Sequence, residues 1–163
     1  MAYNKGRFYE VESILYKVIW TMSATPDELL QARALLGNAL RRMGRTSEAE
    51  KELRKAMELS KAQGKGATKA EVLLAMGKLH FRKGYLVVAE ELTKEGQQAA
   101  REVGNAALAG KALMDLAGIY VMRGNYDAAE PKLQEAIRLF QLAGARSEAV
   151  RALHNLGYVF FHK

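Results

Sequence analysis

The three histidines are the side chains of this 163-residue chain best suited to acid–base or metal chemistry. No cysteine is present, which excludes a cysteine nucleophile. The chain also lacks a His-Glu-x-x-His motif, paired Glu-x-x-His motifs for two metals, and a serine, histidine and aspartate set on separate loops. We therefore expect no enzymatic activity, no metal and no cofactor.

Residues 64–68, Gly-Lys-Gly-Ala-Thr, are the segment nearest in composition to a phosphate-binding loop. Leucine occupies position 59, where that motif has its first glycine, and no apolar strand precedes the segment. Because glycines are common where one helix ends and another begins, we expect a helix–helix turn here.

The overall composition is that of a soluble globular protein, with 49% hydrophobic residues, 26% charged residues and a formal net charge of +7. No apolar run approaches the roughly 20 residues of a membrane span, and the first residues lack the apolar stretch of a secretory signal. We therefore expect a cytoplasmic protein without membrane contact. The basic pI of about 9.6 would attract phosphate. However, no base-stacking aromatic residue recurs along the chain, so nucleic-acid binding is not favoured.

The sequence repeats itself every 40 residues. Glutamates recur at 10, 50, 90 and 130, glycines at 44, 84 and 124, alanines at 49, 89 and 129, and small residues at 37, 77, 117 and 157. A period of this size indicates stacked supersecondary units, each of which buries its apolar face only against a neighbour. His80 occupies a repeat position that is filled elsewhere by Leu40, Tyr120 and Phe160, so we expect it to be a half-buried core residue.

Each unit is predicted to be a pair of helices, because apolar residues recur at three- and four-residue spacing and strand patterns are absent. Ser47 and Glu50 have the spacing of a capping box, which marks a helix N-terminus. The small residues let the two helices of a unit approach closely. The predicted fold class is all-α, with helices at about 7–22, 26–43, 47–63, 67–83, 87–103, 106–123, 127–143 and 146–162.

This pattern resembles the tetratricopeptide repeat. The residues that carry the resemblance are Leu36-Gly37, Leu40, Gly44, Ala49, Leu53 and Ala56, with partial copies at Met76-Gly77, His80, Gly84 and Ala89 and at Leu116, Tyr120, Gly124, Ala129, Leu133 and Ala136. The period is longer than the usual 34 residues, and the proline usual after the second helix is missing. Both departures resemble the long-helix subgroup found in spindle-orientation adaptors, kinesin light chains and bacterial regulators of the maltose-activator and aspartate-phosphatase type. The resemblance implies a right-handed superhelical solenoid that serves as a scaffold for protein–protein interaction.

The chain is expected to form a single solenoid over residues 1–163. Its units are about 26–63, 67–103 and 106–143, with a second helix alone at 4–23 and a first helix alone at 146–163. Both single helices are strongly apolar, whereas a solenoid normally ends in polar helices. Three explanations stay open: truncation of a longer array, cover by another protein, or self-association. The candidate oligomer interface consists of Phe8, Tyr9, Ile14, Leu15, Trp20, Tyr158 and Phe161.

The first helices of the units are expected to line a concave surface. On each of them, residues 31, 34, 38, 41 and 42 or their equivalents form an arc opposite the core. Six basic side chains fall on this arc against Glu71 alone, with apolar side chains between them. We therefore expect the surface to bind an acidic, partly apolar protein segment. The peptide-binding residues would be Asn38, Arg41, Arg42, Leu74, Lys78, Phe81, Arg82, Lys111, Met114, Met122, Arg151 and Tyr158.

In this set the cations would supply charge complementarity, Asn38 would hydrogen-bond the backbone of the bound segment, and the apolar side chains would form anchoring pockets. Tetratricopeptide domains that grip the C-terminal carboxylate of heat-shock chaperones use five polar residues. Here only Asn38 and Lys111 match them, and the other three positions hold Ala34, Ala75 and Asp115, so that clamp is not expected. The alternative function is a sensor or oligomerisation segment of a larger regulatory protein, which would self-associate through its apolar terminal helices.

Overall fold

The computed structural model describes residues 2–21, 24–63 and 66–163. Within these ranges the chain is all-α, as predicted, and contains α1 (Ala2–Trp20), α2 (Pro26–Arg42), α3 (Thr46–Gln63), α4 (Ala67–Arg82), α5 (Leu86–Glu102), α6 (Ala106–Met122), α7 (Tyr126–Leu142) and α8 (Arg146–His162). Helices α2 to α8 begin and end within one residue of the expected bounds. The predicted start of α1 is wrong by five residues, because no periodic glycine or capping residue marks its N-terminus in the sequence.

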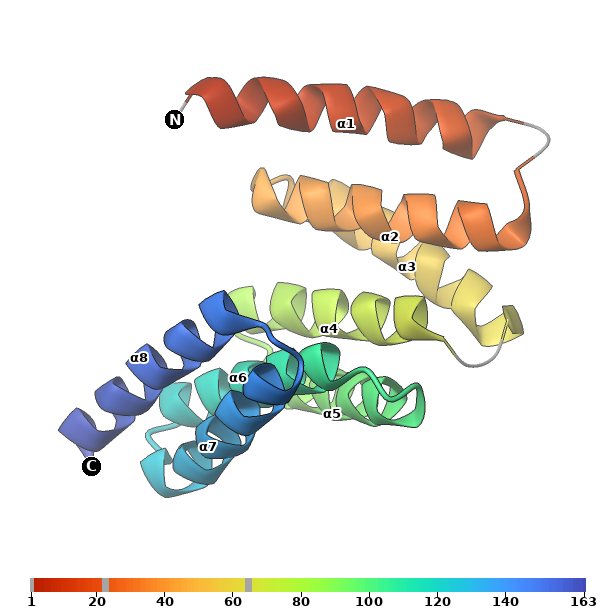
Figure 1. The fold of residues 1–163 in the computed structure, drawn as a ribbon. Coiled ribbons are helices and arrows are strands. Elements are labelled where there is room, and N and C mark those ends of the chain that lie inside the picture. Colours follow the sequence, from red (N-terminus) through yellow and green to blue (C-terminus); the bar gives the residue numbers. More distant parts are fainter. Residues whose placement is uncertain (1, 22–23, 64–65) are drawn as a thin grey trace.

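The helices form a solenoid in which each helix packs mainly on its neighbours in the chain, and the two termini lie at opposite ends of the stack (Figure 1). The closest pairs are α2 with α3, α4 with α5, and α6 with α7. In addition, α2, α4, α6 and α8 contact one another in series, whereas α3, α5 and α7 make no such contacts in the described part of the chain. The first helices of the units therefore form a continuous inner wall.

Glycines end five of the helices in the left-handed conformation, as the periodicity predicts. Gly44 and Gly84 have φ of 82°, and Gly104, Gly124 and Gly144 have φ between 66° and 71°. A residue with a Cβ is strained at such angles, which explains why the chain returns to glycine at these positions. Gly64, which was predicted to end a helix in the same way, lies outside the described residues.

The small residues on the first helices allow close approach within a unit. A Cβ added to Gly77 would lie 2.6 Å from Thr93 Oγ1 on α5, and one added to Gly37 would lie 2.6 Å from Leu53 Cγ on α3. Real Cβ atoms do not approach other atoms so closely, so glycine sets the separation of these two helix pairs. The predicted role of the small residues is confirmed at both positions.

The capping box predicted at Ser47 is wrong. Helix α3 begins at Thr46, so Ser47 lies inside its first turn, and the Glu50 carboxylate instead accepts hydrogen bonds from Arg54 and Lys83. A capping box is present at the start of α2, where Thr25 Oγ1 accepts from the Glu28 amide and Glu28 Oε2 accepts from the Thr25 amide at 2.7 Å. Proline at the first position of α2 also favours a helix start there.

Ion pairs link successive units at one repeated position. Lys83 at the end of α4 pairs with Glu50 on α3, Arg123 at the end of α6 pairs with Glu90 on α5, and Lys163 after α8 pairs with Glu130 on α7 at 2.8 Å. The glutamates at 50, 90 and 130 therefore join α4, α6 and α8 to the second helix of the preceding unit.

His80 is half-buried and lies beside the ring of Tyr85, with 6.0 Å between the ring centroids. Burial lowers the pKa of His80, which favours the neutral imidazole expected of a core residue. Among the described residues, no helix combines the length and apolar character that crossing a membrane requires.

Candidate functional site

Three neighbouring cavities on the inner wall form one groove, which we call the inner groove. The first, of about 260 Å³, lies between α2, α4 and α6. The second, of about 160 Å³, lies mainly between α4, α6 and α8, and the third, also of about 160 Å³, lies between α6, α7 and α8. Lys78 lines the first and second cavities, while Gly118 and Asn155 line the second and third. The cavities are therefore continuous across the units.

Two repeat positions line the inner groove in every unit. One of them, at 38, 78, 118 and 158, belongs to the predicted arc. The other was missed by sequence reasoning and consists of Leu35, Ala75, Asp115 and Asn155. The predicted arc lies opposite the residues that contact the second helix of the same unit. In the structure, contacts between successive units bury Ala34, Leu74 and Met114, which belong to that arc. The groove is therefore lined by position 35 of the repeat and its equivalents. The only signal in the sequence was that Ala75 and Asp115 occupy ligand-facing positions in related domains.

The predicted apolar anchors differ in how far they reach the inner groove. Leu74 is 4% exposed and contacts α5 at Gly96, and Met114 is also buried. Both are therefore core residues, and only a small part of each side chain lines a cavity. Phe81 is half-buried and lines the second cavity. Tyr158 lines the third cavity and stacks on His162. Met122 is exposed and lines none of the three cavities.

Several of the predicted polar residues already have partners within the protein, among them Asn38 and Arg82. Asn38 Nδ2 donates to the Ala34 carbonyl of its own helix at 3.2 Å. Arg82 Nη1 donates to the Arg41 carbonyl at 3.1 Å and so ties α4 to α2. Burial lowers the pKa of Arg41. The structure thus brings Arg41 and Arg82 together at one end of the inner groove, where Arg42 is exposed on the same helix as Arg41.

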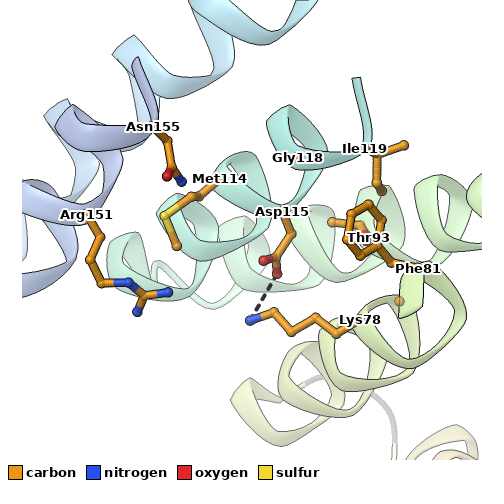
Figure 2. Close-up of a pocket in the computed structure, with 10 residues that line it drawn as sticks. Lys78, Phe81, Thr93, Met114, Asp115, Gly118, Ile119, Arg151 and Asn155 are labelled. Atoms are coloured by element: carbon orange, nitrogen blue, oxygen red, sulfur yellow. Dashed lines mark ion pairs between the residues drawn. The ribbon is translucent and has the colours of Figure 1, made fainter. Parts of the chain in front are cut away.

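The other cations lie further along the inner groove. Lys111 lines the first cavity, Arg151 lines the second, and Lys78 lies at their junction. Asp115 lies between α4 and α8 in the second cavity, where Lys78 Nζ is 3.2 Å from Asp115 Oδ2 (Figure 2). Burial raises the pKa of Asp115, and Lys78, Arg41 and Arg151 oppose that effect. The predicted charge of this surface was too positive because it omitted this carboxylate.

The terminal helices present some of the residues predicted for self-association and bury others. Tyr9, Ile14 and Trp20 are exposed on α1, whereas Leu15 packs into the core between α1 and α2. The side chain of Phe8 lies outside the described residues. Tyr158 faces the inner groove, and Phe161 near the end of α8 is 85% exposed.

A separate apolar face of α8 is open. Val150, Leu153 and Phe160 are exposed on it. One repeat earlier, Gly110 on α6 lies against Phe140 of α7, and Leu113 is fully buried in the core that α7 shares. On α8, the described residues leave the corresponding face uncovered.

Residues 30–63 match a family model described as the tetratricopeptide repeat. No curated protein sequence matches the chain. The fold is similar to the crystal structure of BtubC (BKLC) from P. vanneervenii, with a TM-score of 0.77 and 16% sequence identity over 96% of this chain and 65% of that one. The chain thus spans just under two thirds of the length of BtubC. It is also similar to the crystal structure of MamA, with a TM-score of 0.56 and 20% identity over 98% of this chain and 90% of that one.

The matched segment corresponds to the pair α2 and α3, and the pairs α4–α5 and α6–α7 repeat its architecture in the same 40-residue register. Domains with this fold generally act as scaffolds that bind proteins or peptides. Membership of the long-helix subgroup stays a prediction. The match to the tetratricopeptide repeat therefore covers α2 and α3, and the other two helix pairs share the fold of that repeat.

Proposed function

We propose that this protein is a non-catalytic, cytoplasmic adaptor that binds an acidic, partly apolar protein segment along the inner groove. The observation that carries the proposal is the continuity of the three cavities, because an extended segment or a helix can contact several units at once. The charge and polarity of the groove also change along its length. Cations gather where α2 meets α4, and Val121 and Tyr158 line the cavity at the other end.

Each group would make a different contribution to binding. Arg41, Arg42 and Arg82 would attract acidic residues and speed association, because long-range attraction acts mainly on the rate of encounter. Tyr158 would hold an apolar side chain in the third cavity, and Phe81 would contribute an apolar wall to the second. Asn38 would contribute through its carbonyl group, since its amide group donates within α2.

The test is a charge reversal at the basic end. In the Arg42→Glu/Arg82→Glu variant, we expect the dissociation constant for an acidic, apolar peptide to rise at least about tenfold, because two attractive charges become repulsive. The probe is a short fluorescein-labelled peptide that alternates Glu or Asp with Leu or Phe, and binding is followed by fluorescence anisotropy.

The matched control is Lys51→Glu/Arg138→Glu, which changes the net charge equally on α3 and α7. Neither residue lines a cavity of the inner groove. This control should bind the probe as the unmodified protein does. Equal weakening in both variants would mean that net charge alone attracts the peptide, and unchanged binding in the groove variant would place the site elsewhere.

The open face of α8 supports a second candidate function, self-association within a larger regulatory assembly. Val150, Leu153 and Phe160 would be covered there by a helix of a second copy, as α7 covers α6. In that case light scattering should show an apparent mass that rises with protein concentration, and Leu153→Glu should abolish the rise. Val87→Glu, which replaces an equally exposed apolar residue on α5, should not change it. A mass that stays that of one chain at all concentrations would exclude this function.

A further inference from the structure

The second cavity of the inner groove contains one acidic side chain, Asp115. Its Oδ2 atom is shielded from solvent and lies 3.2 Å from Lys78 Nζ, its ion-pair partner. The Asp115 side chain is nevertheless 18% exposed, so a ligand reaches this carboxylate at its other oxygen, Oδ1. A carboxylate oxygen only accepts hydrogen bonds, so this side of the cavity is chemically suited to a ligand that brings an N–H group.

Two cations line the same cavity. Figure 2 shows Lys78 reaching from α4 and Arg151 reaching from α8 toward the region of Asp115 on α6. The cavity therefore offers one acceptor and two donors within a volume of about 160 Å³. This is a site with both signs of charge within one cavity.

Three kinds of ligand side chain can be compared at this site. A carboxylate would pair with Lys78 and Arg151, but it would be repelled by Asp115 and could not donate a hydrogen bond to it. An ammonium or guanidinium group would satisfy Asp115, but it would lie beside two like charges. A carboxamide carries an NH₂ donor and a carbonyl acceptor on one small neutral group, so it can serve Asp115 and a cation together.

We propose that Asp115 makes the second cavity selective for a carboxamide, so that the bound segment places an asparagine or glutamine side chain between Asp115, Lys78 and Arg151. This inference rests on the proposed binding function of the inner groove. The acidic residues of the segment then lie toward Arg41, whose Nε is also shielded and has no acceptor among the described residues. The ligand pattern becomes acidic, then carboxamide, then apolar along the groove.

The inference is tested with a set of fluorescein-labelled peptides derived from the acidic, apolar probe. In this set, each position in turn carries Gln, Glu or Lys, and binding is measured by anisotropy at pH 8. For the unmodified protein we expect one position at which Gln binds about tenfold more tightly than Glu or Lys. In Asp115→Asn, which has nearly the same shape without the negative charge, Glu should become the preferred residue at that position.

Two further variants separate this role from a structural one. Asp127→Asn makes the same chemical change on the exposed surface of α7 and should keep the preference for Gln. Arg151→Gln removes one positive charge from the cavity without touching Asp115, so it should weaken binding of the Glu peptide more than that of the Gln peptide, while circular dichroism shows an unchanged helical content. It keeps the test decisive even if Asp115→Asn perturbs the fold.

The outcomes distinguish a failure of the proposed binding function from a failure of the carboxamide site. If no peptide of the set binds the unmodified protein, the proposed function fails, and the inference fails with it. If the peptides bind but no position separates Gln from Glu, or if Asp115→Asn keeps the original preference, the proposed function stands and the carboxamide site is overturned.

Discussion

Replacing Phe140 with alanine is expected to lower the free energy of unfolding by about 3–5 kcal/mol, as is typical for a buried aromatic side chain. Phe140 on α7 is fully buried and packs against α6, where a Cβ added to Gly110 would lie 2.9 Å from Phe140 Cε1. The ring therefore fills the space that Gly110 leaves open. Its removal creates a cavity that the close backbone of α6 cannot fill. Urea denaturation followed by circular dichroism measures the loss.

Leu142→Ala is the matched control for this prediction. Leu142 lies on the same helix and is 80% exposed, so its truncation should change the free energy of unfolding by less than about 0.5 kcal/mol. In the double variant Gly110→Leu/Phe140→Ala, the new side chain can enter the cavity, and part of the lost stability should return. A loss for Phe140→Ala no larger than that for Leu142→Ala would show that α6 and α7 do not pack as described.

The substitution Gly77→Val is expected to cost about 2–3 kcal/mol through overpacking. The new Cβ would lie 2.6 Å from Thr93 Oγ1 and 3.3 Å from the Ala89 carbonyl oxygen. Thr93 cannot move away easily, because it is buried and its hydroxyl donates to the Ala89 carbonyl at 2.6 Å. Helices α4 and α5 must therefore separate to admit the side chain. The midpoint and slope of a urea denaturation curve report the change.

The chain offers an internal control at the equivalent position of α8. A Cβ added to Gly157 meets no described atom within 4 Å. Gly157→Val should therefore be neutral or slightly stabilising, because valine has a somewhat higher helix propensity than glycine. If both variants lose the same stability, the cost comes from valine in a helix and not from close packing of α4 on α5.

Most of the fold could be predicted from the sequence because the repeat supplies the same information several times. The turn glycines recur at two positions of the repeat and adopt positive φ, so they mark the helix ends to within a residue. Small residues at Gly37 and Gly77 indicate where two helices touch. The start of α1 has no such repeated signal, and there the prediction was wrong.

The candidate site was harder to predict because it depends on how one unit is turned against the next. A helical wheel identifies the face of α6 that packs on α7, but it does not show which face packs on α8. That second contact buries Met114 and opens the inner groove at Asp115, one residue further along. The pairing of Lys78 with Asp115 likewise joins residues 37 positions apart on two different first helices, which no pattern within one unit reports.

The ion pairs between successive units have a common response to salt. Lys83–Glu50, Arg123–Glu90 and Lys163–Glu130 repeat at one position near the surface, where a single pair contributes at most about 1 kcal/mol and is screened by salt. The three pairs are alike in position and weak individually, so no single one of them holds the units together, and high salt should weaken all three to a similar degree.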